Sequence, residues 1–182
     1  MANIDCIDKI TKSVFQDAIK EEAKRLFGSA LEIEVDPTDP NCEHDVRSNL
    51  LSKKPIKGIY FLLTEDQKLL YVGKSENISN RVVAHIKGTD INNSGKYYWA
   101  IRRVRVLPVS DDVSVKDHNQ LEKDFIKALM PAFNGATSSN TYKIFGYDSL
   151  YFEMKSGYNL KGSRGQNRIF VENLIKRWPV LN

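Results

Sequence analysis

The chain has 182 residues, of which 41% are hydrophobic and 27% are charged, and its mean hydropathy is −0.42. This composition is typical of a globular domain and excludes a chain that is disordered throughout or fibrous. No apolar run approaches the roughly 20 residues of a membrane-spanning helix, so an integral membrane protein is not expected. The first 28 residues mix charged and apolar side chains, unlike a secretory signal, and two cysteines cannot form a disulfide framework. We therefore expect an intracellular, cytoplasmic location.

Charge is unevenly distributed along the chain. Residues 1–50 carry 6 Lys or Arg and 11 Asp or Glu, a net charge of −5, whereas residues 51–182 carry 21 and 12, a net charge of +9. The basic part can either bind a polyanion such as nucleic acid or only keep the protein in solution, and charge alone does not separate these interpretations. We expect three segments: an acidic helical arm and linker over 1–50, a core over 51–135, and a basic C-terminal extension packed on the core over 136–182.

The first elements in chain order are a helix, a connector and a hairpin. Apolar residues recur at helical spacing over residues 5–28, which predicts an amphipathic helix. Residues 36–44 contain two prolines and several Asp and Asn residues, so they are expected to form a connector without helix or strand. Two β-prone runs, 58–63 and 69–73, flank a short polar segment, and this pattern predicts a β-hairpin.

Two further helices and a strand are expected after the hairpin. A helix capped by Ser75 or Asn77 ends at Gly88, and residues 97–106 are rich in the aromatic and β-branched residues of a strand. Residues 118–129 carry an apolar stripe at helical spacing before a proline that ends the helix. The tail is expected to contain a strand at 149–154, a glycine-rich basic loop at 161–168 and a short helix at 169–177.

Residues able to carry chemistry lie in the hairpin and the helix after it. Tyr60 and Tyr71 stand on the two predicted strands, in the triplets Gly58-Ile59-Tyr60 and Tyr71-Val72-Gly73, and can face the same side. Arg81 and His85 are four residues apart and so share one face of the next helix. Taken singly, each of these residues also fits a plain structural role in a sheet or on a solvated helix face.

This arrangement resembles the GIY-YIG nuclease superfamily over residues 57–134. The two triplets are ten residues apart and are followed by Arg81, then Glu122 on the later helix, then Asn134. His85 matches a position that many members fill with histidine, and the second triplet has Val where the family name has Ile. The resemblance implies an α+β fold with a small three-stranded mixed or antiparallel sheet flanked by helices.

The resemblance also implies hydrolysis of a phosphodiester bond with one divalent metal, Mg²⁺ or Mn²⁺, and it favours DNA over RNA without deciding between them. A phosphodiester is an anion, and attack by water adds charge to its non-bridging oxygens, which a metal and a guanidinium can stabilise. Glu122 is the expected metal ligand, because a carboxylate is a hard oxygen donor. Arg81 would bind the scissile phosphate, Lys74 would orient or polarise the water, and Asn134 would hold the site by hydrogen bonds.

A tyrosine is the expected general base. The ordinary pKa of tyrosine, about 10, would be lowered by neighbouring positive charge. Tyr60 and Tyr71 remain equal candidates, and His85 would accept the proton of the tyrosine. His118, one turn before Glu122 on the same predicted helix, is expected at the surface.

Six basic residues outside this set are candidates for binding nucleic acid. They are Arg102, Arg103 and Arg105 on the third strand, and Lys161, Arg164 and Arg168 in the C-terminal loop. By alternation, Arg103 and Arg105 point to one face of the sheet and Arg102 to the other. Arginine can track phosphates or read base edges, but the strand set also fits a sheet edge protected by charge, and the loop set fits an ordinary surface loop.

The predicted function is that of a divalent-metal-dependent DNA endonuclease of restriction, phage or mobile-element type. The alternative is a catalytically inactive nucleic-acid-binding module of the same fold. The acidic arm has two interpretations of its own. It can shield the basic site from non-cognate DNA, or it can form the interface of a homodimer, which is one way to cut both strands of a duplex.

Overall fold

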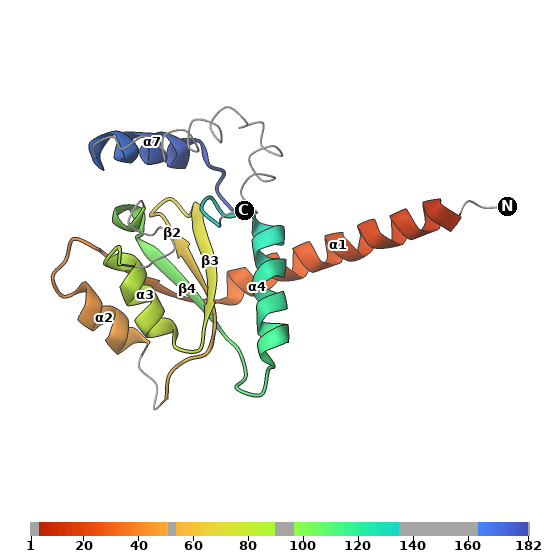
Figure 1. The fold of residues 1–182 in the computed structure, drawn as a ribbon, viewed down its shortest axis with the longest axis horizontal. Coiled ribbons are helices and arrows are strands. Elements are labelled where there is room, and N and C mark those ends of the chain that lie inside the picture. The colour runs from red at the N-terminus through yellow and green to blue at the C-terminus, as the bar shows by residue number, and fades with distance from the viewer. Residues whose placement is uncertain (1–3, 51–53, 90–96, 135–163, 182) are drawn as a thin grey trace.

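The structure is a computed structural model that describes residues 4–50, 54–89, 97–134 and 164–181 (Figure 1). In these residues, helices pack on both faces of one four-stranded antiparallel sheet, which confirms the α+β class. The strands are β1 (Leu31–Glu34), β2 (Gly58–Leu63), β3 (Leu69–Ser75) and β4 (Arg103–Pro108). Their order in the sheet is β1-β4-β2-β3, so β3 is an edge strand and β2 lies inside the sheet.

The hairpin forms as predicted, and its inner strand is buried on both faces. All six residues of β2 are buried, because β3 and β4 pair with its two edges and helices cover both of its faces. The polar turn between β2 and β3 closes through Gln67, whose positive φ of 62° is the left-handed conformation that such turns require.

The expected count of three strands was wrong, because the acidic arm contributes a fourth. β1 pairs antiparallel with β4, from Leu31 opposite Val106 to Glu34 opposite Arg103. A four-residue strand carries too little alternation to stand out in the sequence, and here its partner strand lies some 70 positions later. The division of the chain near residue 50 stays a prediction, and the arm on one side of it shares a sheet with the core on the other.

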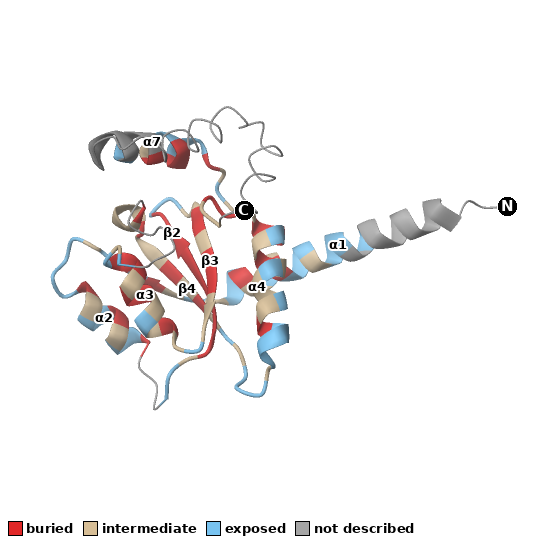
Figure 2. Cartoon of the chain, viewed as in Figure 1, coloured by how far each residue is buried: buried red, intermediate tan, exposed pale blue. Residues whose placement is uncertain are grey.

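Helices α1 (Ile4–Ser29) and α4 (Val115–Leu129) pack against one face of the sheet (Figure 1). Phe61 of β2 lies at their contact, with its ring 5.1 Å from that of Phe27 and 5.1 Å from that of Phe125, both edge to face. Edge-to-face aromatic pairs add to the stabilisation from apolar burial. The first part of α1 extends away from the sheet, and its described residues there are mostly exposed (Figure 2).

Helices α2 (Cys42–Asn49), α3 (Ile78–Ile86) and α7 (Arg164–Arg177) contribute to the core on the other face. Val46, Val82 and Val171, one from each helix, share this core with Tyr60 and Leu62 of β2. Within the described part of the chain, no helix is both long and apolar enough to cross a membrane.

Several predicted boundaries differ from the observed ones. Residues 42–44 begin helix α2 instead of extending the connector, because the prolines end at residue 40 and the next residues are free to turn. The strand predicted over 97–106 begins only at Arg103, after the 3₁₀ helix Tyr98–Ala100. Residues 164–168 lie in α7 and not in a loop. The strand expected at 149–154 lies outside the described residues.

Candidate active site

The hairpin places both tyrosines on one face of the sheet. Tyr60 stands directly opposite Gly73, and Leu62 stands opposite Tyr71, so the two phenol rings are neighbours with centroids 6.2 Å apart. A Cβ atom at Gly73 would lie 2.3 Å from Oη of Tyr60 and 2.8 Å from the Tyr71 ring. Glycine at position 73 therefore makes the space that the ring of Tyr60 occupies.

The glycine of the first triplet has a similar steric role. A Cβ atom at Gly58 would lie 2.2 Å from the backbone oxygen of Leu107 in β4. Only a glycine lets the first residue of β2 approach β4 this closely. The two glycines of the sequence motif thus hold the sheet and the tyrosine ring in place.

Tyr60 is connected to both predicted residues of α3. Its Oη lies 2.9 Å from Nε2 of His85, and Nε of Arg81 donates to the same oxygen at 3.4 Å. Asn77 caps helix α3, and its side chain accepts a hydrogen bond from the backbone of Asn80, as predicted for a cap. Tyr60 itself is buried, with only 1% of its surface exposed.

Tyr71 differs from Tyr60 in its exposure. It is half-buried, and its ring lies 5.0 Å from that of His85, centroid to centroid. The ring of Tyr97 also stacks on it, with centroids 6.4 Å apart, and Phe133 stacks on Tyr97 at 4.6 Å. Tyr71 is therefore held in a row of aromatic rings, with part of its surface open to solvent.

Asn134 completes the outer edge of β3. Its side chain accepts a hydrogen bond from the N–H of Val72 at 2.9 Å and donates one to the C=O of Val72 at 2.6 Å. The backbone N–H groups of Ala132 and Phe133 also donate to β3. Within the described residues β3 is an edge strand, and these contacts hold its segment between Tyr71 and Gly73.

Glu122 lies on α4, which runs beside β3 (Figure 1). Burial raises the pKa of its carboxyl above the ordinary value, and the nearby charge and backbone amide of Lys74 only partly offset this effect. The charges of His118 and Arg81 act in the same direction as Lys74. The carboxyl of Glu122 therefore lies near the end of β3, where it accepts a hydrogen bond from the backbone amide of Lys74.

A metal at Glu122 would have few protein ligands. In the described ranges, no three His, Cys, Asp or Glu side chains gather as a ligand cluster. One carboxylate fits Mg²⁺, which keeps several waters and takes other ligands from the phosphates of a substrate. It does not fit a structural zinc site, which needs four protein ligands.

His118 is buried, so its expected place at the surface was wrong. It is 1% exposed, and its Nε2 donates to the backbone oxygen of Gly58 at 3.1 Å. Its Nδ1 lies 3.4 Å from Oε1 of Glu76. The sequence offered one signal for this position, the four-residue spacing to Glu122, which puts both side chains on one face of α4.

Two of the strand arginines contact the acidic arm and not the tyrosine cluster. Glu32 of β1 binds Arg103 at 2.8 Å and Arg105 at 2.6 Å, as expected for arginines on one face of the sheet. The guanidinium of Arg105 also lies 4.4 Å from the centre of the Phe27 ring. A role of these arginines in binding DNA stays a prediction, and a DNA backbone would have to compete with Glu32.

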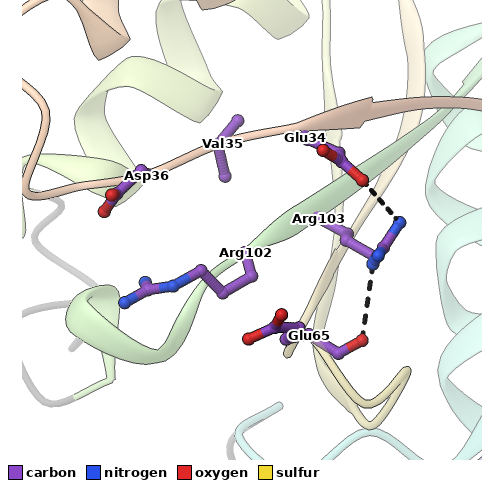
Figure 3. Close-up of a pocket in the computed structure, with 6 residues that line it drawn as sticks. All are labelled: Glu34, Val35, Asp36, Glu65, Arg102 and Arg103. Carbon is purple, nitrogen blue, oxygen red and sulfur yellow. Dashed lines mark hydrogen bonds and ion pairs between the residues drawn. The ribbon is translucent and has the colours of Figure 1, made fainter.

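Arg102 directly precedes β4 and, with Arg103, lines a small open cavity of about 330 Å³ (Figure 3). Its Nη1 donates to the backbone oxygens of Trp99 and Ile101, both at 2.8 Å. Across the cavity, Arg103 contacts Glu34 at 3.1 Å and the backbone oxygen of Glu65 at 3.4 Å. The cavity mixes carboxylates and guanidiniums, so its lining does not favour an anion.

The C-terminal candidates are only partly described. Lys161 lies outside the described residues, and Arg164 is placed only as the first residue of α7. Arg168 is exposed on α7, with its guanidinium 4.7 Å from the centre of the Trp99 ring and its Nε 3.1 Å from Glu172. Their role in binding DNA also stays a prediction.

Comparisons with known proteins agree with the fold of this part of the chain. The family model for a UvrC-like GIY-YIG domain matches residues 56–135. UvrABC system protein C of Saccharophagus degradans is 29% identical over 90 residues, which are 50% of this chain and 14% of that protein. The Lactobacillus johnsonii protein of the same name is 33% identical over 85 residues, 47% of this chain and 13% of that protein.

The chain thus matches only a small part of these relatives. A third relative, UvrABC system protein C of Aromatoleum aromaticum, is 27% identical over 97 residues, 53% of this chain and 16% of that protein. No solved structure matches the chain significantly. The restriction, phage or mobile-element setting expected from the sequence finds no support among these relatives, because they share a different name.

Proposed function

We propose that this chain, whose residues 56–135 form a UvrC-like GIY-YIG domain, is a divalent-metal-dependent endonuclease that hydrolyses phosphodiester bonds in DNA. The observation that carries the proposal is that α4, the helix of Glu122, packs on β3, the strand of Tyr71, while Arg81 of α3 donates to Tyr60 of β2. The carboxyl of Glu122 is within electrostatic reach of Lys74 and Arg81, and Arg81 donates to the phenol of Tyr60. The proposed metal ligand, the proposed phosphate-binding guanidinium and the two phenols therefore come from β3 itself and from elements that pack against it, α4, α3 and β2.

The residues divide the work according to their chemistry. Glu122 is the residue that would hold Mg²⁺ or Mn²⁺, which when bound stabilises negative charge on the phosphate oxygens. Arg81 binds the scissile phosphate, because its guanidinium offers several donors in a fixed plane. Lys74 orients the attacking water from the end of β3, and Asn134 keeps the backbone of β3 in register.

The burial of the two tyrosines separates their roles. A general base must reach the water from which it takes a proton. Tyr60 is 1% exposed and its Oη is already bound by His85 and Arg81, whereas Tyr71 is half-buried. We therefore assign the general base to Tyr71. Tyr60 holds His85 and Arg81 by hydrogen bonds. His85 lies beside both rings and accepts the proton of Tyr71.

The proposal is tested by incubating the full chain with supercoiled plasmid, branched DNA and single-stranded DNA in Mg²⁺ or Mn²⁺. We expect cleavage that stops when EDTA is added or when Glu122 is replaced by Gln. The matched control is Glu21→Gln, which removes an exposed glutamate from α1 and should cut like the parent. Binding of all three DNAs without any product would favour the inactive binding module, and equal cutting by Glu122→Gln would refute the metal assignment.

A further inference from the structure

His118 ties together the three elements that carry the proposed site. It belongs to α4, one turn before Glu122, and its Nε2 donates to the backbone oxygen of Gly58, two residues before Tyr60 in β2. Its Nδ1 faces Glu76, which follows Lys74 by two residues in the loop between β3 and α3. A single buried side chain thus joins the helix of the proposed metal ligand to β2 and to the loop that follows β3.

A second connection closes this network around the start of α4. Lys57 precedes Gly58, is 8% exposed, and donates from its Nζ to the backbone oxygen of Val113 at 2.8 Å. The same Nζ lies 3.5 Å from Oε2 of Glu76. Glu76 is therefore shared between Lys57 and His118, and the beginning of α4 is held to β2 from two sides.

The physical need for such a connection follows from the sparse ligand set. Where one carboxylate supplies the only protein ligand, the position of the metal depends on where the helix of that carboxylate lies relative to the phosphate-binding groups. A displacement of about 1 Å can cost about 100-fold in rate. Partners that orient a metal ligand typically contribute about 10- to 100-fold in affinity or activity.

We infer that His118 is a positioning residue that fixes Glu122 relative to Tyr60 and Lys74 through its contacts with Gly58 and Glu76. The inference rests on the proposed function, since it concerns the geometry of the same site. In this role His118 would neither coordinate the metal nor contact the substrate. It acts by preventing α4 from sliding along β2 and β3, and its removal changes the metal dependence more than it changes the affinity for DNA.

The test compares three variants of the full chain with a matched control. His118→Leu removes the donor to Gly58 and leaves a similar volume, His118→Gln can still donate through its amide, and Glu76→Ala removes the second contact from an exposed position. The control is Gln120→Leu, which also replaces a polar side chain of α4 by leucine, but at an exposed position. We measure the rate of cleavage, the Mg²⁺ concentration for half-maximal rate, DNA affinity in Ca²⁺, and the rise in Tm caused by Mn²⁺ without DNA.

We expect His118→Leu to cut about 10- to 100-fold more slowly, with a higher half-maximal Mg²⁺ concentration and a smaller Mn²⁺-induced rise in Tm. Its DNA affinity should stay within about twofold of the parent. The cleavage rate of His118→Gln should fall between those of the parent and His118→Leu. A lower Tm with unchanged rate and unchanged metal dependence would mean a structural role only and overturn the inference. If His118→Leu does not fold, Glu76→Ala decides: a raised half-maximal Mg²⁺ concentration supports the inference, and an unchanged one overturns it.

The Mn²⁺ measurement separates this inference from the proposed function. A parent chain that gains Tm with Mn²⁺ but cuts no substrate would refute the endonuclease, while a reduced gain in His118→Leu would still support the positioning role. A parent chain that cuts, together with a His118→Leu variant that cuts equally well, would leave the endonuclease intact and refute the positioning role.

Discussion

Replacing Gly73 by alanine tests whether the second glycine of the motif makes room for Tyr60. The new Cβ would lie 2.3 Å from Oη and 2.5 Å from Cζ of that ring, about 1 Å inside the range of ordinary contact. The ring cannot withdraw cheaply, because it is buried and bound to His85 and Arg81. Overpacking of this kind costs about 1–3 kcal/mol, and we expect Gly73→Ala to lose that much unfolding free energy.

The same change should also slow cleavage. Movement of the Tyr60 ring by about 1 Å would displace His85 and Arg81, and misplacement of that size can cost about 100-fold in rate. Unfolding in urea can be followed by tryptophan fluorescence, since Trp99 and Trp178 are both packed against the core. Cleavage is measured in parallel at saturating Mg²⁺.

Gly28→Ala is the matched control for this experiment. Position 28 lies in α1 with no atom within 4 Å of an added Cβ, so alanine there should stabilise the chain by about 0.5–1 kcal/mol through its higher helix propensity. If Gly73→Ala is as stable and as active as Gly28→Ala, the steric argument for the motif is refuted.

Three other changes give distinct outcomes. Burial opposes ionisation of Glu32, but hydrogen bonds from its two arginine partners outweigh it and lower the pKa of its carboxyl. The stabilisation from this group is therefore present above the unfolded pKa of about 4.5 and is lost as pH falls through the lower folded value. Glu32→Gln should lower the unfolding free energy by about 1 kcal/mol at pH 7, and this loss should shrink as the pH falls through the folded pKa of Glu32. Urea unfolding at pH 7 and at an acidic pH measures both losses, and a loss that does not change with pH would contradict the ion pairs. Asn134→Ala leaves both backbone groups of Val72 without their side-chain partner and should lower the unfolding free energy by about 1–3 kcal/mol and slow cleavage; a fully stable variant would count against this. Tyr71→Phe should abolish cleavage with little change in Tm, whereas Tyr60→Phe should lower both, because it removes buried hydrogen bonds; the reverse pattern would move the general base to Tyr60.

Elements with strong local signals could be predicted from the sequence. The hairpin follows from two β-prone runs around a polar turn, and α3 follows from its Asn77 cap and apolar stripe. The order of the tyrosines, Arg81, Glu122 and Asn134 along the chain was enough to identify the domain. These features depend on residues close to one another, or on a fixed order of residue types, and a sequence displays both directly.

Only the tertiary structure decided which of these residues are buried and what they contact. The strand β1 forms by pairing with β4. Arg103 and Arg105 form ion pairs with Glu32, which lies about 70 positions earlier in the chain. His118 is buried beside Gly58, 60 positions away, whose backbone oxygen accepts its hydrogen bond. The burial of Tyr60, in contrast to Tyr71, likewise depends on helices that follow it in the chain. Contacts across such distances depend on how whole elements pack, and the spacing of residues along the chain does not encode that packing in any local pattern.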